Sequence, residues 1–219
     1  MTLKAKLDRW LGEAGTEGFP PGWFERVEAL DDLLEKWSGR ISLSGLSGEE
    51  QRGQRYFAEA LAAKKYVPLR GTALDIGTGA GSPALPLAIV TPGLEWVLLE
   101  SRRLKAGFLR EAVRTLCLEN VRVETRRFDD SWGGAGYGVV TTRGIKLRGE
   151  ILENVESRLA DGGRHLWFSS ESILKDAARR LGERAALRVE GPMRLLAAAN
   201  VKSGWLLVCE RVRETGCFT

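Results

Sequence analysis

The residues from Leu74 to Gly81 carry the clearest chemical signal in this chain of 219 residues. They read Leu-Asp-Ile-Gly-Thr-Gly-Ala-Gly, an apolar run that leads into glycines at alternate positions, Gly77, Gly79 and Gly81. Glycine lets the backbone turn sharply and lets a ligand approach closely, because no Cβ stands in the way. A strand that passes through such a loop into a helix indicates a nucleotide-type cofactor site. A plain glycine turn is the alternative.

The neighbours of the glycines narrow the choice of cofactor. The dinucleotide fingerprint has a third glycine where this chain has Ser82. Asp75 precedes the first glycine, and its carboxylate would repel a pyrophosphate but suits a cationic ligand. These two residues favour S-adenosylmethionine (SAM), whose amino acid moiety and sulfonium tolerate or prefer nearby negative charge, over a nicotinamide dinucleotide.

The rest of the chain supplies the elements that would position this loop. Strands are expected at 72–76, 96–100, 121–124, 137–141 and 164–168, with helices from about 83 and at 103–117, 149–159 and 172–181. Two closing runs, 194–198 and 205–210, would form an antiparallel hairpin joined through 200–204. The pattern predicts an α/β fold of the class I SAM-dependent methyltransferase type, a Rossmann-like, doubly wound, mostly parallel seven-stranded sheet with a C-terminal antiparallel hairpin.

A small helical extension is expected over residues 1–68, ahead of a SAM-binding domain at 69–219. One helix is predicted from apolar residues that recur at spacings of four and three and therefore share a face: Trp23, Val27, Leu30, Leu34 and Trp37. Ser47 followed by Glu50 has the form of a capping box, which predicts a second helix that runs toward Tyr66.

Ligands of doubly wound sheets bind at the carboxyl ends of the strands, so strand-end residues matter most. Glu100 ends the second strand about 25 residues beyond Asp75, near the spacing of the acid that accepts hydrogen bonds from a ribose. Past the third strand, Arg127, Phe128 and Asp129 stand where methyltransferases recognise adenine, Phe128 covering the ring and Asp129 or a nearby N–H addressing the N6 amine. A solvated glutamate and simple turn residues are the alternatives.

Arg143 follows the fourth strand, at the carboxyl edge of the sheet and beside the expected methyl donor. A cation there is costly unless it meets an anion or an acceptor, so we predict a catalytic or substrate-holding role, with a structural salt bridge as the alternative. Basic residues near successive strand ends favour an RNA partner over a small apolar substrate, although each could simply be solvated: Arg102, Arg103, Lys105, Arg126, Arg127, Arg143, Lys146 and Arg148.

Composition limits the alternatives. A hydrophobic content of 43% over this length suits one α/β domain with a modest extension, and the net charge of +4 permits a nucleic-acid partner without requiring one. Cys117, Cys209, Cys217 and His165 lack the spacing of metal ligands, so no metal is expected. No run approaches the roughly 20 apolar residues of a membrane span. We therefore expect a cytoplasmic, monomeric protein.

Four segments together resemble the RsmG (GidB) family, bacterial methyltransferases that act on N7 of a guanine in small-subunit (16S) ribosomal RNA. They are LDIGTGAGSPALPLAI, LLESRRLKAGFLREA, ENVRVETRRFDD and YGVVTTRGI, and the similarity spans roughly Trp23 to Phe168. The prolines that follow the glycine loop, Pro83 and Pro86, are its most diagnostic part. The resemblance implies SAM as cofactor and 16S rRNA or the small ribosomal subunit as partner. It also implies that Glu100, the segment Arg127 to Asp129, and Arg143 line the site.

The chain departs from the family pattern mainly where substrate would be handled. Ser38 and Ser42 replace asparagines, and Ser169 stands in place of a lysine. Tyr56 replaces the histidine of the family's Arg-His-x-x-Asp-Ser-Leu, and the C-terminal Pro-Arg segment is absent from 211–219. Cofactor residues are kept better than substrate residues, which supports SAM binding more strongly than the rRNA target.

A sparse site can still methylate N7 of guanine, because this atom has a lone pair and no proton to remove, so alignment matters more than a general base. As a hypothesis, Arg143 holds a flipped guanine by O6 or by its phosphate; a grip on O6 and N7 together would occupy the attacking lone pair. A SAM-dependent methyltransferase of another substrate and a non-catalytic RNA-binding relative stay open as alternatives.

Overall fold

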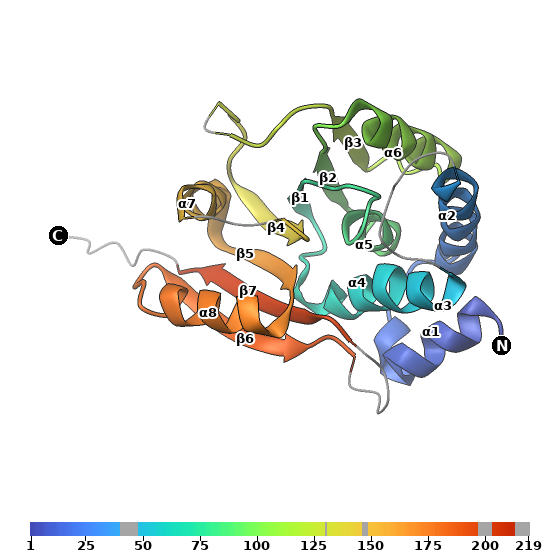
Figure 1. Cartoon of the computed structure of the whole chain (residues 1–219), viewed down its shortest axis with the longest axis horizontal. Helices are drawn as coiled ribbons and strands as arrows, with labels where there is room; N and C mark the ends of the chain where they lie inside the picture. Colours follow the sequence, from blue (N-terminus) through green and yellow to red (C-terminus); the bar gives the residue numbers. More distant parts are fainter. Residues whose placement is uncertain (40–47, 130, 146–148, 197–202, 213–219) are drawn as a thin grey trace.

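The computed structural model describes residues 1–39, 48–129, 131–145, 149–196 and 203–212 (Figure 1). Its centre is a seven-stranded sheet in the order β3-β2-β1-β4-β5-β7-β6. The strands are β1 Gly71–Ile76, β2 Leu94–Leu99, β3 Val121–Glu124, β4 Tyr137–Arg143, β5 Leu159–Ser169, β6 Leu187–Arg194 and β7 Trp205–Arg211. The first five strands run parallel, and β7 lies antiparallel between β5 and β6. The predicted fold class is therefore confirmed.

The helices occupy both faces of the sheet. They are α1 Leu3–Leu11, α2 Trp23–Ser38, α3 Glu49–Gln51, α4 Glu59–Ala62, α5 Ala84–Val90, α6 Arg103–Thr115, α7 Gly149–Arg158 and α8 Glu171–Leu181. A π-helical turn, η2 (Arg52–Ala58), joins α3 to α4, and 3-10 turns lie at η1 (Glu13–Thr16) and η3 (Ala63–Tyr66). Figure 1 shows α2, α5 and α6 on one side of the sheet and α7 on the other.

Alternation along each strand explains why both faces can be covered, since successive side chains point to opposite faces. Ala73 and Leu98 belong to a hydrophobic cluster shared with α2, α4, α5 and α6. Their sequence neighbours Leu74 and Val97 pack in a second cluster with α7, while Trp167 of β5 packs in a third cluster with α8. The carboxyl ends of β1, β2 and β4 thus meet at one edge, between two helical layers.

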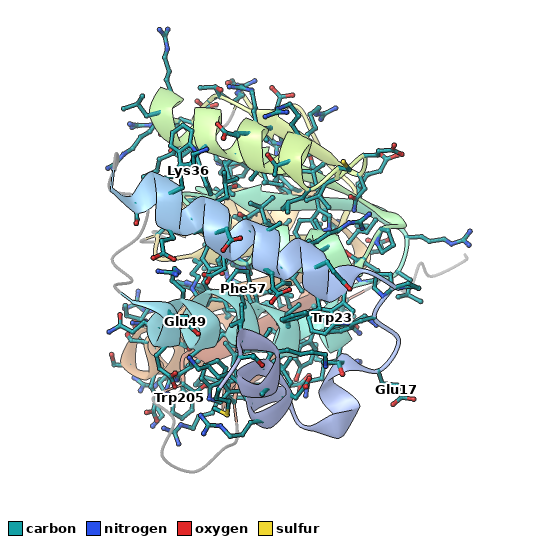
Figure 2. All side chains as sticks on the ribbon, turned by 90° about the vertical axis from the view of Figure 1, so that its right-hand side faces the viewer. Glu17, Trp23, Lys36, Glu49, Phe57 and Trp205 are labelled. Atoms are coloured by element: carbon teal, nitrogen blue, oxygen red, sulfur yellow. The ribbon has the colours of Figure 1, made fainter. Side chains whose placement is uncertain are left out.

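The helices that precede β1 share the main hydrophobic cluster with the sheet. Leu7 of α1, Leu30 of α2 and Phe57 of the π-helical turn all lie in it. A largely buried ion pair, with Arg52 Nε 2.6 Å from Asp31 Oδ1, ties the π-helical turn to α2. Figure 2 shows α2 running beside the segment that carries the labelled Glu49 and Phe57. The N-terminal part is therefore packed closely enough to place its side chains at the carboxyl edge of the sheet.

The two predicted N-terminal helices differ in outcome. The first is confirmed as α2, whose buried residues include Val27, Leu30 and Leu34. The second is divided into α3, η2, α4 and η3. It begins after Gly48, a residue without a side chain that could cap it, and Ser47 lies outside the described residues. The π-helical turn in its middle is the part that sequence periodicity did not predict.

The closing hairpin is present, but its first strand was placed wrongly. β6 covers Leu187–Arg194 instead of 194–198, and the connection to β7 is correspondingly longer than 200–204. The dipeptide Gly191-Pro192 resembles a turn, yet it lies inside β6, where the pairing register with β7 shifts between Glu190 and Met193. Proline is tolerated there because β6 is an edge strand.

Strand β5 also begins earlier than predicted. Leu159 already pairs with Tyr137 of β4, and the register shifts before the second stretch of pairing starts at Arg164. The glycines Gly162 and Gly163 interrupt the regular pattern, which explains why the sequence predicted a strand from 164 only.

Candidate functional site

The glycine loop lies at the carboxyl end of β1. At two of its positions both the backbone angle φ and the lack of room for a Cβ require glycine. Gly77 has φ +67° and Gly81 has φ +103°, values that residues with a Cβ rarely adopt. A Cβ on Gly77 would lie 2.9 Å from Cγ2 of Ile145, and one on Gly81 would lie 2.8 Å from the Tyr56 hydroxyl oxygen. Neighbouring side chains therefore already fill the space around the loop.

Glu100 follows β2 and holds the glycine loop against the start of α6. Its Oε2 accepts a hydrogen bond from the Gly79 N–H at 2.8 Å, and its Oε1 accepts one from the Arg102 N–H at 2.8 Å. The residue is 6% exposed. Each carboxylate oxygen has a second lone pair, so the group can also accept hydrogen bonds from a ribose.

Asp75 ends β1 as a buried carboxylate with one oxygen satisfied. Its Oδ1 accepts a hydrogen bond from the Thr141 hydroxyl of β4 at 2.5 Å. Its Oδ2 is buried and has no hydrogen-bond partner among the residues that the structure describes. Burial raises the pKa of Asp75 to about 7, against the opposing effect of the Thr141 hydroxyl. An unpartnered carboxylate oxygen next to a glycine loop fits a cationic group such as the ammonium of SAM.

A pocket of about 200 Å³ opens at the ends of β1 and β2. Its walls come from both strands, from the segment after β3, from the end of β4 and from α7: Ile76, Gly77, Leu99, Ser101, Arg126, Arg127, Phe128, Ile145 and Ile151. Two of the three residues predicted to contact adenine, Arg127 and Phe128, line it. Phe128 packs on the cluster beneath the pocket, so its ring is held in the wall.

Asp129 stands apart from these two residues. Its Oδ1 accepts hydrogen bonds from the Ser131 N–H at 3.0 Å and from the Ser131 hydroxyl at 2.5 Å. Arg126 approaches the same oxygen at 3.8 Å, and the carboxylate is exposed. Asp129 therefore shapes its own loop in this structure, and a contact from its side chain to adenine stays a prediction.

Arg143 lies at the end of β4, and its guanidinium has two protein partners. Its Nη1 donates to the Ser82 hydroxyl oxygen at 3.1 Å, and its Nη2 forms an ion pair with Glu59. The guanidinium also lies 5.6 Å from the centre of the Phe168 ring. Burial lowers the pKa of Arg143, and the positive charge of the exposed Arg55 acts in the same direction. The salt bridge that the sequence left as an alternative is present, and the side chain is still 21% exposed.

Glu59 lies at the candidate site, although the sequence analysis did not single it out. It lies on α4 with its side chain fully buried, and its Oε1 accepts a hydrogen bond from the Gly204 N–H at 2.6 Å. A Cβ on Gly204 would lie 2.7 Å from this carboxylate. One acidic residue therefore joins α4, β4 and the start of β7. Its sequence signal was its position in the resembled motif, because Glu59 stands where Arg-His-x-x-Asp-Ser-Leu has its aspartate.

The departures from the family pattern lie in different places. The Tyr56 hydroxyl is buried and donates to the Ala80 carbonyl of the glycine loop at 2.6 Å. Ser38 bonds the carbonyl of Glu35 in its own helix, and Ser169 pairs with a residue of β7 at the end of β5. Ser42 lies outside the described residues. Tyr56 is thus the departure that touches the candidate cofactor site directly.

His165, which the sequence analysis considered as a metal ligand, lies in the core. His165 is buried, with Nε2 2.9 Å from the Thr142 hydroxyl oxygen, and burial lowers its pKa to about 3. Within the described ranges, no cluster of His, Cys, Asp and Glu is arranged to hold a metal ion. No described helix has the length and apolar character to cross a membrane.

The strand order, the antiparallel last pair and the glycine loop after the first strand define a class I SAM-dependent methyltransferase fold. Solved structures agree. A methyltransferase from Geobacter sulfurreducens superposes with a TM-score of 0.59 and 16% identity, over 96% of this chain and 97% of that chain. A SAM-dependent O-methyltransferase from Thermotoga maritima gives a TM-score of 0.59 at 13% identity, over 84% and 72% of the two chains. At these identities the likeness shows the fold alone.

Sequence comparison identifies the family within this class. The sequence model of GidB, described as rRNA small subunit methyltransferase G, matches residues 24–190. A ribosomal RNA small subunit methyltransferase G of Stenotrophomonas maltophilia (strain K279a) is 36% identical over 131 residues, 60% of this chain and 61% of the relative. One from Xanthomonas campestris pv. campestris (strain 8004) is 34% identical over 166 residues, 73% and 77% of the two chains. The chain belongs to this family.

Proposed function

We propose that the protein is a SAM-dependent methyltransferase that transfers a methyl group to N7 of a guanine in 16S rRNA. The observation that carries the cofactor is the pocket at the ends of β1 and β2, beside a glycine loop and an unpartnered carboxylate oxygen. Membership of the family supports the rRNA substrate, because the relatives are named for that activity.

The residues of the pocket and the two carboxylates at the strand ends beside it suggest how SAM would be bound. Glu100 would accept hydrogen bonds from the ribose hydroxyls while it continues to hold the Gly79 N–H. Asp75 would face the positively charged amino acid part with its free Oδ2. Phe128 would cover the adenine ring from the pocket wall, and Arg127 would close the outer rim.

SAM would supply a methyl group activated by its sulfonium. The protein's own contribution is alignment, because guanine N7 needs no base. Arg143 is suited to aligning the base, because Glu59 and Ser82 hold two of its nitrogens and so give the guanidinium a set orientation. Its remaining N–H donors would hold O6 or a phosphate of the flipped nucleotide and leave the N7 lone pair free to attack.

The expected setting follows from this function. We propose that the protein acts as a monomer in the cytoplasm, on 16S rRNA or the small ribosomal subunit. The division into a helical extension, 1–68, and a SAM-binding domain, 69–219, is part of the same proposal. Glu59 on α4 supports a substrate-side role for the extension, because it holds Arg143 in place.

Mapping N7-methylguanine in 16S rRNA from cells with and without the gene tests the substrate. Loss of one modified position on deletion is the expected result, and an unchanged map would remove rRNA as the target. A thermal shift with SAM tests the cofactor separately, since a ligand at 100 times its Kd stabilises by about 2.7 kcal/mol. SAM binding with an unchanged map would indicate a methyltransferase of another substrate, and no binding would indicate a non-catalytic relative.

Arg143→Lys is the variant that tests the proposed role of Arg143. It keeps a positive charge for Glu59 but removes the planar fork, so the fold is expected to persist while methylation falls by at least about tenfold. SAM affinity is expected to stay the same. Full methylation in this variant would contradict a substrate-holding role.

A further inference from the structure

The π-helical turn η2 places Tyr56 against three consecutive residues of the glycine loop. The Tyr56 hydroxyl donates to the Ala80 carbonyl at 2.6 Å. The Ser82 hydroxyl donates to the Tyr56 carbonyl at 2.9 Å. Between them, the Tyr56 hydroxyl oxygen would lie 2.8 Å from a Cβ on Gly81, so the tyrosine and the Leu85 side chain together occupy the space beside that glycine.

Tyr56 is buried, which makes the hydrogen bond of its hydroxyl costly to lose. Tyr56 is 1% exposed, and its ring packs edge-on against Phe57 at a centroid distance of 4.8 Å. Burial also raises the pKa of the Tyr56 phenol well above its usual value, so the hydroxyl keeps its proton and remains a donor. A buried acceptor that loses such a donor suffers the full cost of its desolvation, so the Ala80 carbonyl depends on this hydroxyl.

The same loop residue connects the tyrosine to the candidate substrate side. The Ser82 hydroxyl oxygen that donates to Tyr56 accepts the hydrogen bond from Nη1 of Arg143 at 3.1 Å. A shift of Ala80 to Ser82 would therefore move an anchor of Arg143 as well as the glycine loop that leads from Gly77, a residue of the pocket wall.

We propose that Tyr56 is a positioning residue, which holds the glycine loop from Ala80 to Ser82 in the shape that binds SAM. The histidine of the resembled family motif is replaced here by a side chain whose hydroxyl reaches the loop backbone. The proposal rests on the proposed function for the identity of the ligand, but the bracing of the loop is a property of the ligand-free chain.

The test is Tyr56→Phe, which removes one oxygen and keeps the ring in the core. Hydrogen exchange of the ligand-free protein is compared between loop peptides within 77–87 and reference peptides from α8. SAM affinity is measured by calorimetry on the same samples. Tyr66→Phe is the matched control, because its hydroxyl bonds Glu190 and Met193 away from the loop.

We expect loop exchange in Tyr56→Phe to accelerate several-fold with α8 unchanged, and the SAM Kd to rise about tenfold. Tyr66→Phe is expected to change neither quantity. Unchanged loop exchange and unchanged SAM affinity would overturn the proposal, as would equal acceleration in the loop and α8, which indicates a general core residue. Faster loop exchange in a protein whose wild type does not bind SAM would support the bracing and contradict the proposed function.

Discussion

The candidate site has a cofactor side, at Asp75, the glycine loop and Glu100, and a substrate side, at Arg143 and Glu59. The hydrogen-bond partners of Glu100 and of Arg143 differ in how far away they lie along the chain. At the end of β2, Glu100 bonds backbone groups 21 and 2 residues away, in the glycine loop after β1 and just before α6. At the end of β4, Arg143 bonds Ser82 at 61 and Glu59 at 84 residues' separation. Glu100 therefore has local partners, whereas the partners of Arg143 come together only when the N-terminal helices pack on the sheet.

The two sides also differ in charge. The cofactor side holds two buried carboxylates, and Asp75 keeps one oxygen without a partner among the described residues. The substrate side holds Arg143, with the exposed Arg55 near enough to affect its pKa. The cofactor side therefore offers carboxylates to a cationic methyl donor, and the substrate side offers guanidinium N–H donors to a nucleic acid while Glu59 balances the charge of Arg143.

Glu59→Ala is expected to have the largest effect, because Glu59 makes two of the long-range contacts of the substrate side, one to Arg143 and one to Gly204. It leaves the Arg143 cation without its counter-ion and the Gly204 N–H without its acceptor, so the free energy of unfolding should fall by about 3–5 kcal/mol. Chemical denaturation measures this change. Adding Arg143→Met should recover part of the loss, since it removes the unpaired charge.

Asp8→Ala is the control for this experiment, since Asp8 forms an exposed i,i+4 pair with Lys4. Its loss of stability should be far smaller. Equal losses for the two variants would show that the buried pair does not organise the substrate side.

Glu100→Gln is expected to weaken SAM binding by about 100-fold, because the amide presents a donor where the Gly79 or Arg102 N–H requires an acceptor. Calorimetry measures the Kd. Glu124→Gln, at the end of β3 with a half-exposed side chain, is the matched control and should leave the Kd nearly unchanged. A similar Kd for both variants would mean that the β2 carboxylate does not contribute to the cofactor side.

The pH dependence of SAM affinity tests Asp75. Because its pKa is about 7, the carboxylate is mostly protonated at pH 6 and mostly ionised at pH 8, and a cationic ligand prefers the ionised form. The Kd should therefore fall about tenfold between these pH values. Asp75→Asn has no carboxylate to titrate, so its Kd should not fall over this range, and a wild-type Kd that does not fall would contradict the assignment.

The stability of the ligand-free protein should change with pH in the opposite sense. Burial raises the folded-state pKa of Asp75 above its ordinary value of 3.8, so between that value and about 7 the folded chain keeps a proton that the unfolded chain releases. This contribution to stability is complete below 3.8 and is lost as pH rises through about 7. Denaturation of wild type and Asp75→Asn at several pH values isolates it as the difference between the two curves.

Arg55→Gln is expected to have the smallest effect and to act on the substrate side alone. Arg55 is exposed and near Arg143, so its loss should weaken RNA binding several-fold and reduce the salt dependence of binding by about one phosphate contact. SAM affinity should not change. Arg179→Gln, on α8, is the control, and an equal effect on RNA binding from both variants would show that only net charge matters.

How far the sequence predicts this protein depends on the range of the interactions involved. The bounds of β3 agree residue for residue, and β1, β2, α6 and α8 agree within two residues, because apolar periodicity and turn residues act locally. The edge strand β6 was predicted at 194–198 instead of 187–194, because Gly191-Pro192 resembles a turn and only pairing with β7 makes this segment a strand. The division at residue 68 and the roles of the site residues stay predictions.

Asp75, the glycines and Glu100 could be recognised from their types and spacing, since one β-α-β unit, from β1 to the end of β2, carries all of them. The surroundings of Arg143 could not, because its partners Glu59 and Ser82, and the Gly204 N–H that donates to Glu59, come together only through tertiary packing. The cofactor could therefore be predicted from the order of residues along the chain. The arrangement of the substrate side depends instead on contacts between residues up to 145 positions apart. Local backbone geometry encodes the first, and burial of a charge far from its partner along the chain creates the second.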